Sequence, residues 1–181
     1  MNIPIFLSYP KPFIKKQQEF VESITEYLVE RNFLPRTLGV TDYDVSEPLT
    51  AIRRLMLESN GVLVIAFRRY KIINGTANLD SDIDGIKQYD LSNQWKTSPW
   101  CQIEPAMAFQ IGLPILVLRE KGVIADGILE KGVLGTYMPE FDLDGSLDTY
   151  FQSQEWKQMI SIGEGYVRRV VENKGQPPIL Y

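Results

Sequence analysis

The sequence predicts an α/β fold, in which a parallel β-sheet is covered by helices on both faces. Short apolar runs alternate along the chain with stretches of helical periodicity, as in successive β-α-β units. The run at residues 62–67 is apolar throughout, which is typical of a strand buried on both faces of a parallel sheet. A length of 181 residues suits one domain, so we expect residues 1–181 to form a single unit. Right-handed crossovers between its strands then give a doubly wound, three-layer sandwich.

The first part of the chain predicts a strand, a helix and an edge strand. Residues 3–7 form a short apolar run ended by Ser8-Tyr9-Pro10, which predicts a buried strand followed by a loop. Between residues 13 and 33 apolar side chains recur at helical spacing, with charged side chains on the opposite face. Residues 33–38 predict a second strand, and Pro35 favours an edge position because proline cannot donate to a sheet ladder.

A second helix and the most apolar strand follow a polar loop at residues 39–47. Ser46 is the expected N-cap of this helix, and Pro48 suits its first turn because proline lacks the N–H that would be left unpaired there. Asn60-Gly61 is a common stop after a helix. Residues 62–67 then predict the central strand of the sheet.

The second half of the chain is less regular. Residues 68–97 are polar and have no sustained period, which predicts an irregular insertion that serves as a functional flap or a mobile segment. A helix over 100–111 and a buried strand over 113–118 follow. Residues 121–150 are again irregular, and short elements are expected at 124–129 and 133–137. A final helix is predicted over 154–172.

Composition excludes several classes of chemistry. The chain has no histidine, so it cannot use Ser-His-Asp or Cys-His nucleophiles or His-ligated zinc. Cys101 is the only cysteine, so neither an internal disulfide nor a thiolate metal cluster can form. A net charge of −4 gives no basic field, and we expect no nucleic-acid or membrane partner. No signal peptide or membrane-spanning run is present, so a cytoplasmic location is expected.

The predicted topology points to where a ligand would bind. In doubly wound folds the site lies at the carboxyl ends of the strands, near the point where the strand order reverses. This rule selects four segments as the rim of a site: Ser8-Tyr9-Pro10, Leu38–Asp44, Phe67–Tyr70 and Trp100–Glu104. The glycine-rich phosphate loops of Rossmann and P-loop proteins do not occur in the sequence.

Trp100-Cys101-Gln102-Ile103-Glu104 is the most specific pattern in the chain. It resembles the Trp-Cys-x-x-Glu motif of the TIR domain family. Phe6-Leu7-Ser8-Tyr9 is similar to the first-strand signature of that family, and residues 52–70 are similar to its second helix and third strand. The resemblance covers residues 3–118. It implies a flavodoxin-like sandwich with a parallel sheet of about five strands in the order 2-1-3-4-5.

For enzymatic TIR domains the resemblance implies an NAD glycohydrolase or cyclase, with a role in prokaryotic antiviral defence and activity as a homo-oligomer. Glu104 would be the catalytic residue. Nicotinamide leaves a cationic ring as a neutral base, so one carboxylate that stabilises or traps an oxocarbenium-like sugar is sufficient. The substrate contacts would be Ser8, Tyr9, Arg68 and Trp100, and Trp100 would form a wall against a ring. NAD is then a nucleotide substrate, and no cofactor is expected.

Pro105 departs from the TIR pattern, because a proline inside a helix removes the hydrogen bond to the residue four places earlier. Either the helix begins near Glu104, with Pro105 in its first turn, or it kinks there. Residues 104–114 are similar to nucleoside 2-deoxyribosyltransferase-like proteins, which place a catalytic glutamate at a helix start and use a tyrosine near the chain end, here Tyr181. A deoxyribosyltransferase or nucleotide N-glycosidase is therefore the second hypothesis. A non-catalytic TIR-like module that binds a partner or a nucleotide signal is the third.

The insertion contains a partial match to a calcium-binding loop. Asp80, Asp82 and Asp84 alternate before Gly85, as oxygen ligands do in such loops. The twelfth position of the loop is Leu91, where a calcium site needs a bidentate glutamate. We therefore expect a solvated acidic turn with no metal.

Overall fold

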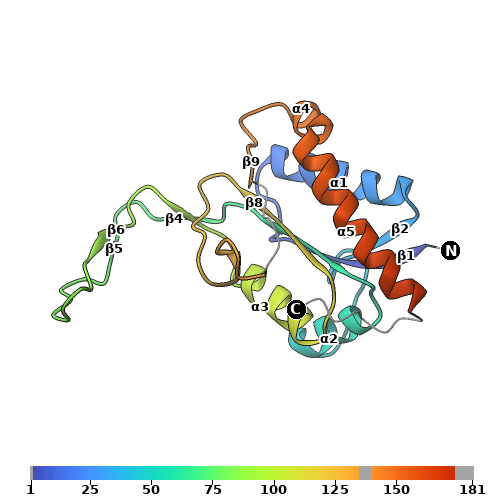
Figure 1. Cartoon of the computed structure of the whole chain (residues 1–181), viewed down its shortest axis with the longest axis horizontal. Helices are drawn as coiled ribbons and strands as arrows, with labels where there is room; N and C mark the ends of the chain where they lie inside the picture. The colour runs from blue at the N-terminus through green and yellow to red at the C-terminus, as the bar shows by residue number, and fades with distance from the viewer. Residues whose placement is uncertain (1, 135–139, 174–181) are drawn as a thin grey trace.

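A computed structural model describes residues 2–134 and 140–173, and shows a layered α/β body from which a long arm projects (Figure 1). The five strands of the main sheet pair in parallel in the order β2-β1-β3-β8-β9, which confirms the predicted fold class and the strand order 2-1-3-4-5. The strands of this sheet are β1 (Ile3–Ser8), β2 (Phe33–Arg36), β3 (Val62–Ala66), β8 (Ile115–Glu120) and β9 (Glu140–Phe141).

Two pairs of helices cover the two faces of the sheet, and each pair encloses one half of the core. Helices α1 (Lys15–Glu30) and α5 (Gln154–Glu172) pack on one face, and the bounds of α5 are those expected from the sequence. Helices α2 (Pro48–Leu57) and α3 (Trp100–Gln110) pack on the other. The central strand β3 is buried along its whole length, because its side chains point alternately into both halves of the core.

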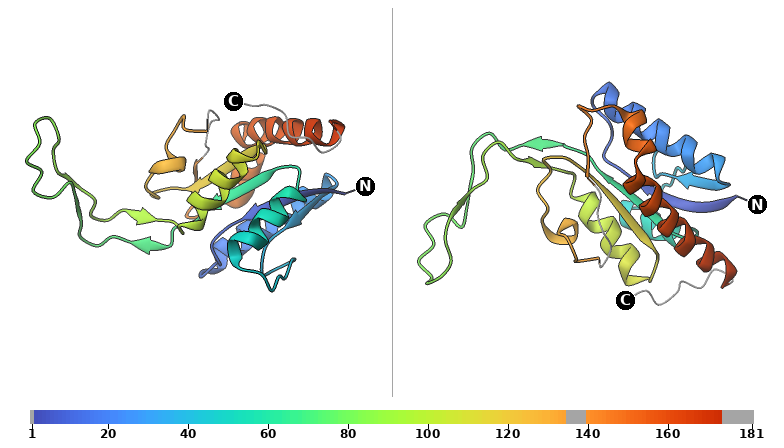
Figure 2. Two further views of the ribbon diagram at one scale, coloured as in Figure 1. Left: turned by 90° about the horizontal axis from the view of Figure 1, so that it is seen from below. Right: turned by 45° about the horizontal axis from the view of Figure 1, so that its top comes forward.

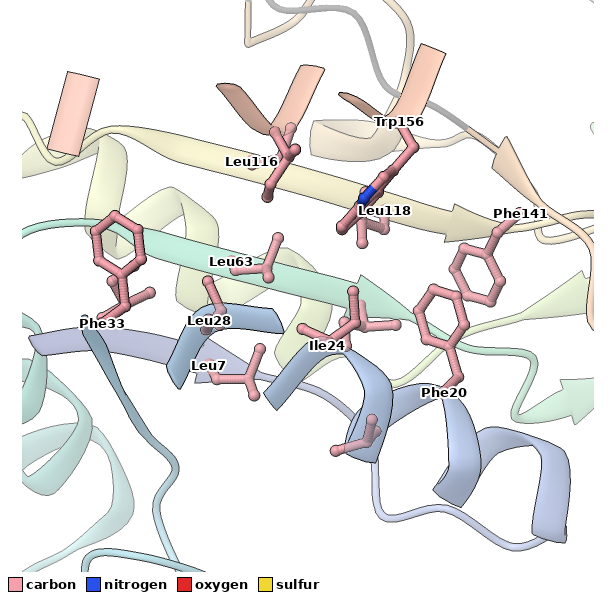
Figure 3. Packing of buried hydrophobic residues seen from close by; sticks show 14 of the residues in the cluster. Leu7, Phe20, Ile24, Leu28, Phe33, Leu63, Leu116, Leu118, Phe141 and Trp156 are labelled. Carbon is pink, nitrogen blue, oxygen red and sulfur yellow. The ribbon is translucent and has the colours of Figure 1, made fainter. Parts of the chain in front are cut away.

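An aromatic cluster fills the core on the α1–α5 side (Figure 3). Phe20 of α1 stacks on Phe141 of β9 with their ring centroids 4.1 Å apart, and Phe67 meets both rings edge-on. Trp156 of α5 is fully buried beside them. This packing ties the first helix to the last strand, so the carboxyl ends of the strands are held in a fixed arrangement.

The strand order reverses between β1 and β3. From β1 the chain passes through α1 to β2 on one side, and β3 then pairs with the other side of β1. Ser8, the last residue of β1, is in register with Val64 of β3. The sheet therefore has its topological switch point beside Ser8, where ligands bind in open α/β sheets.

One expectation about a helix start is wrong, and the two alternatives for the helix that contains Pro105 are resolved. The N-cap of α2 is Glu47 and not Ser46, because Pro48 is itself the first residue of the helix, and the Ser46 N–H donates to Asp44 Oδ1 at 2.8 Å in the preceding loop. Helix α3 begins at Trp100, so Pro105 lies in its second turn and not in the first turn of a helix that starts near Glu104. Pro105 thus leaves one internal hydrogen bond of α3 unmade.

Residues 68–97 form an extended arm that is irregular over most of its length and is held together by two short pairs of strands. Strand β4 (Tyr70–Lys71) pairs antiparallel with β7 (Trp95–Lys96), and β5 (Thr76–Ala77) pairs in the same way with β6 (Tyr89–Asp90). The Arg69 N–H donates to the Lys96 carbonyl at 2.9 Å and closes the base. We call residues 70–96 the arm, which extends away from the body in every view (Figure 2).

The region after β8 holds short elements, as expected, although at shifted positions. A 3-10 turn at Gly127–Leu129 lies within the expected element at 124–129, and the short helix α4 (Leu147–Gln152) precedes α5. Part of the expected element at 133–137 lies outside the described residues, and so does Tyr181. Among the described residues, no helix is both long enough and apolar enough to cross a membrane.

Candidate active site

A cleft of about 470 Å³ opens at the carboxyl ends of β1 and β3, at the switch point of the sheet. All four segments that the topology rule selects contribute to its lining. The lining residues are Tyr9, Pro10, Lys11, Leu38, Pro48, Ile52, Arg69, Tyr70, Ser98, Trp100 and Glu104. Its volume is within the range of small-molecule sites.

Glu104 occupies a position on α3 that would normally hold an apolar side chain. The buried residues Cys101, Glu104 and Ala108 recur at helical spacing and form the stripe of α3 that faces the sheet. Only 8% of Glu104 is exposed, yet it lines the cleft. Helix α3 therefore places one carboxyl group at the floor of the cleft, against the ends of β1 and β3.

Ser8 holds this carboxyl group in place. The hydroxyl of Ser8, itself buried at the end of β1, donates a hydrogen bond to Glu104 Oε2. No ion pair reaches Glu104 from any residue that the structure describes. Burial raises the pKa of Glu104 to about 7, and the Ser8 hydrogen bond opposes that rise by stabilising the carboxylate. Glu104 is thus poised to change its charge near neutral pH, as groups at active sites often are.

Cys101 is a core residue and not a nucleophile. It is fully buried, and its thiol lies 3.5 Å from the Thr97 hydroxyl and 3.8 Å from the Ile65 carbonyl. Burial raises the pKa of the Cys101 thiol to about 12, so the reactive thiolate does not form at neutral pH. The candidate reactive group of the cleft is therefore Glu104 and not Cys101.

Aromatic and cationic side chains line the mouth of the cleft. Trp100 at the start of α3 and Tyr70 at the start of the arm are 39% and 56% exposed, so their rings are accessible. Tyr9 is half-buried, and burial raises the pKa of its phenol although a hydrogen bond with Thr37 lowers it. Tyr70 was not predicted as a contact residue, although it belongs to a segment that the topology rule selects.

The arginine of the cleft is Arg69 and not Arg68. Arg69 lines the cleft, and its Nη1 donates to the Lys11 carbonyl at 3.1 Å, which places two cationic residues on one wall. Arg68 points elsewhere: its Nε donates to the Lys121 carbonyl at 2.7 Å, and its guanidinium pairs with Glu120. Successive side chains of an extended chain point in opposite directions, so only one of the two can face the cleft.

A buried polar cluster fixes the backbone that precedes Arg69. Glu120 at the end of β8 is only 2% exposed and accepts hydrogen bonds from the Arg68 N–H, at 2.7 Å, and from Gln17 Nε2, at 3.3 Å. Gln17 also donates to the Arg68 carbonyl. Burial raises the pKa of Glu120, and these donors lower it. This cluster could not be predicted from the sequence, because its members lie about 50 residues apart.

Carboxylates of the arm do not gather around one point. Among the described residues, no group of three or more His, Cys, Asp or Glu side chains is arranged to hold a metal ion. Asp80, Asp82 and Asp84 are all exposed, as a solvated acidic turn would be.

The chain matches no protein-family model and no curated protein. Among solved structures it is similar to the CMP N-glycosidase BcmB of Clostridium botulinum. The two sequences are 13% identical, the superposition covers 77% of this chain and 85% of BcmB, and the TM-score is 0.44. It is also similar to the TIR domains of the Roq1 resistosome that recognises the effector XopQ. That similarity has 12% sequence identity, covers 95% of this chain and 75% of the Roq1 chain, and has a TM-score of 0.41. Likenesses at this level carry no argument about function, which therefore has to come from the residues of the cleft.

Proposed function

We propose that the protein is an N-glycosidase that cleaves the bond between a sugar C1′ and a base nitrogen in a nucleotide, and that its substrate is NAD. The observation that carries this proposal is the position of Glu104. It is a buried carboxyl group at the switch point of the sheet, hydrogen-bonded to Ser8 and open to a cleft with aromatic and cationic walls.

The proposed reaction needs one carboxylate. The C1′–N bond breaks with its electron pair going to the nitrogen, and the sugar passes through an oxocarbenium-like state. Glu104 in its ionised form stabilises this cation or bonds to C1′. Water then forms the new C1′–O bond and gives up a proton. Ser8 keeps the carboxylate oriented, because its hydroxyl is fixed at the end of β1.

The lining of the cleft favours NAD over a neutral nucleoside. A neutral base needs a proton as it leaves, which retaining and inverting glycosidases supply from a second carboxyl group. Glu104 is the only carboxyl group among the described residues that line the cleft. Nicotinamide needs no proton, because its ring nitrogen is already cationic in NAD. One carboxylate therefore matches this leaving group.

The remaining walls suit the rest of a dinucleotide. Trp100 and Tyr70 present accessible rings on which a nicotinamide or adenine could stack. Arg69 and Lys11 contribute cationic groups, and a guanidinium binds phosphate oxygens through two parallel hydrogen bonds. In this arrangement Arg69 takes the role that the sequence analysis assigned to Arg68.

The test is the release of nicotinamide from NAD by concentrated protein, followed by chromatography of the products. Concentrated samples are needed because the TIR resemblance links activity to self-association. We expect Glu104→Gln to abolish release, because the neutral amide cannot stabilise the cation. Glu19→Gln on the exposed side of α1 is the matched control and should retain full activity. Release that is unchanged in Glu104→Gln would remove Glu104 from the mechanism.

The same samples separate the other hypotheses. Incubation with thymidine and adenine tests the deoxyribosyltransferase, since base exchange would support that enzyme and contradict the NAD proposal. A non-catalytic module would turn over neither substrate at any protein concentration. Chromatography also distinguishes ADP-ribose from a cyclised product.

A further inference from the structure

The tip of the arm, residues 78–90, carries apolar side chains that the described chain leaves open to solvent. Leu79, Ile83 and Ile86 are 66%, 62% and 47% exposed, and Tyr89 beside them is 58% exposed. A two-stranded ribbon is only marginally stable by itself in water. Apolar side chains gathered at the end of such a ribbon are typical of a surface that binds a partner.

A groove with complementary properties lies between α2 and α3. It has a volume of about 510 Å³, and its lining residues are Arg53, Met56, Ile103, Ala106, Met107, Gln110 and Ile111. Arg53 is the only charged residue among them. Its neighbour Arg54 pairs with Asp44 and Glu58, but Arg53 makes no ion pair with any described residue. The groove thus combines an apolar floor with an unpaired cation.

The charge of the tip is opposite to that of the groove. Residues 78–90 contain four aspartates and one lysine. Within the described parts of the chain, Asp80, Asp82 and Asp84 form no hydrogen bond or ion pair through their carboxylates. Asp82 and Asp84 flank Ile83 in the sequence, so an apolar contact at Ile83 would bring two carboxylates close to a cation at the edge of a groove.

We propose that the tip of the arm of one copy docks into the α2–α3 groove of a second copy. Leu79, Ile83 and Ile86 would fill the groove, and the aspartates would face Arg53. This inference goes beyond the proposed enzyme function, because it assigns an interface that does not depend on Glu104 or on any substrate.

The length and direction of the arm favour a second copy as the occupant. The 14 residues from 70 to 83 span up to roughly 45 Å when extended, against a radius of gyration of about 16 Å for a compact chain of this length. In Figure 1 and Figure 2 the arm points away from α2 and α3 of its own body. It is therefore long enough to pass a neighbouring body and is directed away from its own groove.

Reciprocal exchange doubles the area that the contact buries, because each copy then contributes one arm and one groove. Burying one such exposed apolar side chain removes roughly 100 Å² from water. Three of these side chains on each of two arms contribute about 600 Å², and the groove surface that they cover adds to this area, so the interface is of the smaller, reversible kind. Reciprocal docking also closes the assembly with two-fold symmetry, so it ends at two copies.

Cross-linking tests the contact directly, because Cys101 is buried and unreactive and introduced cysteines would be the only accessible thiols. A tagged Asp82→Cys chain is mixed with an untagged Arg53→Cys chain and oxidised. We expect a disulfide-linked species that contains one chain of each kind. If each variant links only to itself, or no linked species forms, the proposed contact is wrong.

Sedimentation velocity on the intact chain supplies the second measurement. We expect a species of twice the chain mass. Ile83→Asp and Arg53→Glu should each raise the dissociation constant of this dimer by at least tenfold. Ile73→Asp is the matched control, because Ile73 is 64% exposed on the arm but lies outside the tip. Combining Arg53→Glu with Asp82→Lys should restore the dimer. A chain that is monomeric at every concentration, or a dimer indifferent to these changes, would overturn the proposal.

Discussion

Replacing Glu104 with glutamine should make the protein more stable above neutral pH while removing its activity. The carboxyl group is 8% exposed, and its pKa in the folded chain is about 7 against an ordinary value of 4.5. The folded chain therefore holds this proton more tightly than the unfolded chain does. The contribution of Glu104 to stability is greatest below pH 4.5, falls as the pH rises from 4.5 to 7, and is constant above that window.

The magnitude follows from the two pKa values. At 1.36 kcal/mol for each pH unit, the interval from 4.5 to 7 corresponds to a loss of about 3 kcal/mol at pH 8. Glutamine does not titrate and can still accept the Ser8 hydrogen bond, so Glu104→Gln escapes this loss. For a domain of 150–250 residues, 1 kcal/mol shifts Tm by roughly 2–4 °C. We therefore expect Tm to rise by roughly 6–12 °C at pH 8 and to change little at pH 4.5.

Scanning calorimetry at the two pH values measures this difference. Other groups titrate equally in the two proteins, including Glu120, so their contributions cancel when the Tm values are subtracted. Glu19→Gln, in which an exposed carboxyl is replaced, should show no such dependence on pH. A Glu104→Gln protein that is less stable at pH 8, or whose Tm difference is the same at both values, would refute the argument from burial.

Four further variants test the site and the core. The value of kcat/KM for NAD should rise with pH up to about 7 and then level off, and Ser8→Ala should move this rise to higher pH because the carboxylate loses its donor. Trp100→Ala should raise KM about 5- to 150-fold, since stacking of a base on an aromatic ring contributes about 1–3 kcal/mol. Arg69→Ala should raise KM by about 10- to 150-fold if its guanidinium binds phosphate, as steady-state kinetics would show. Phe20→Ala should lower the free energy of unfolding by about 3–5 kcal/mol in urea denaturation, because it empties the centre of the aromatic cluster.

Periodicity and apolar runs predicted the body of the fold because these elements obey local rules. The run at 62–67 and the helical spacing over 154–172 each correspond to an observed element, β3 and α5. The topology rule also selected the four segments that line the cleft, since it depends only on where parallel strands end. The location of the site could thus be predicted from strand order alone.

Features set by distant residues could not be predicted in this way. Which of Arg68 and Arg69 faces the cleft is decided by Glu120, which binds the Arg68 N–H from 52 positions away. Apart from Trp95 at its base, which packs against the core, the strands of the arm present no apolar face to the body, so they leave no alternating pattern in the sequence. The sequence predicted Glu104 at the site but left its place within the helix open, because Pro105 allowed either a helix that starts near Glu104 or one that kinks there.

Because the base of the arm is closed, the length and sequence of the arm can change independently of the body. The two chains leave and re-enter the body side by side, held by the bond from Arg69 to Lys96 at 2.9 Å. Adjacent ends are where a fold best tolerates insertion or removal of chain. The arm can therefore lengthen, shorten or change its tip over evolution without disturbing β3 or α3. Proteins with the same body could in this way differ in the partner that their arm binds.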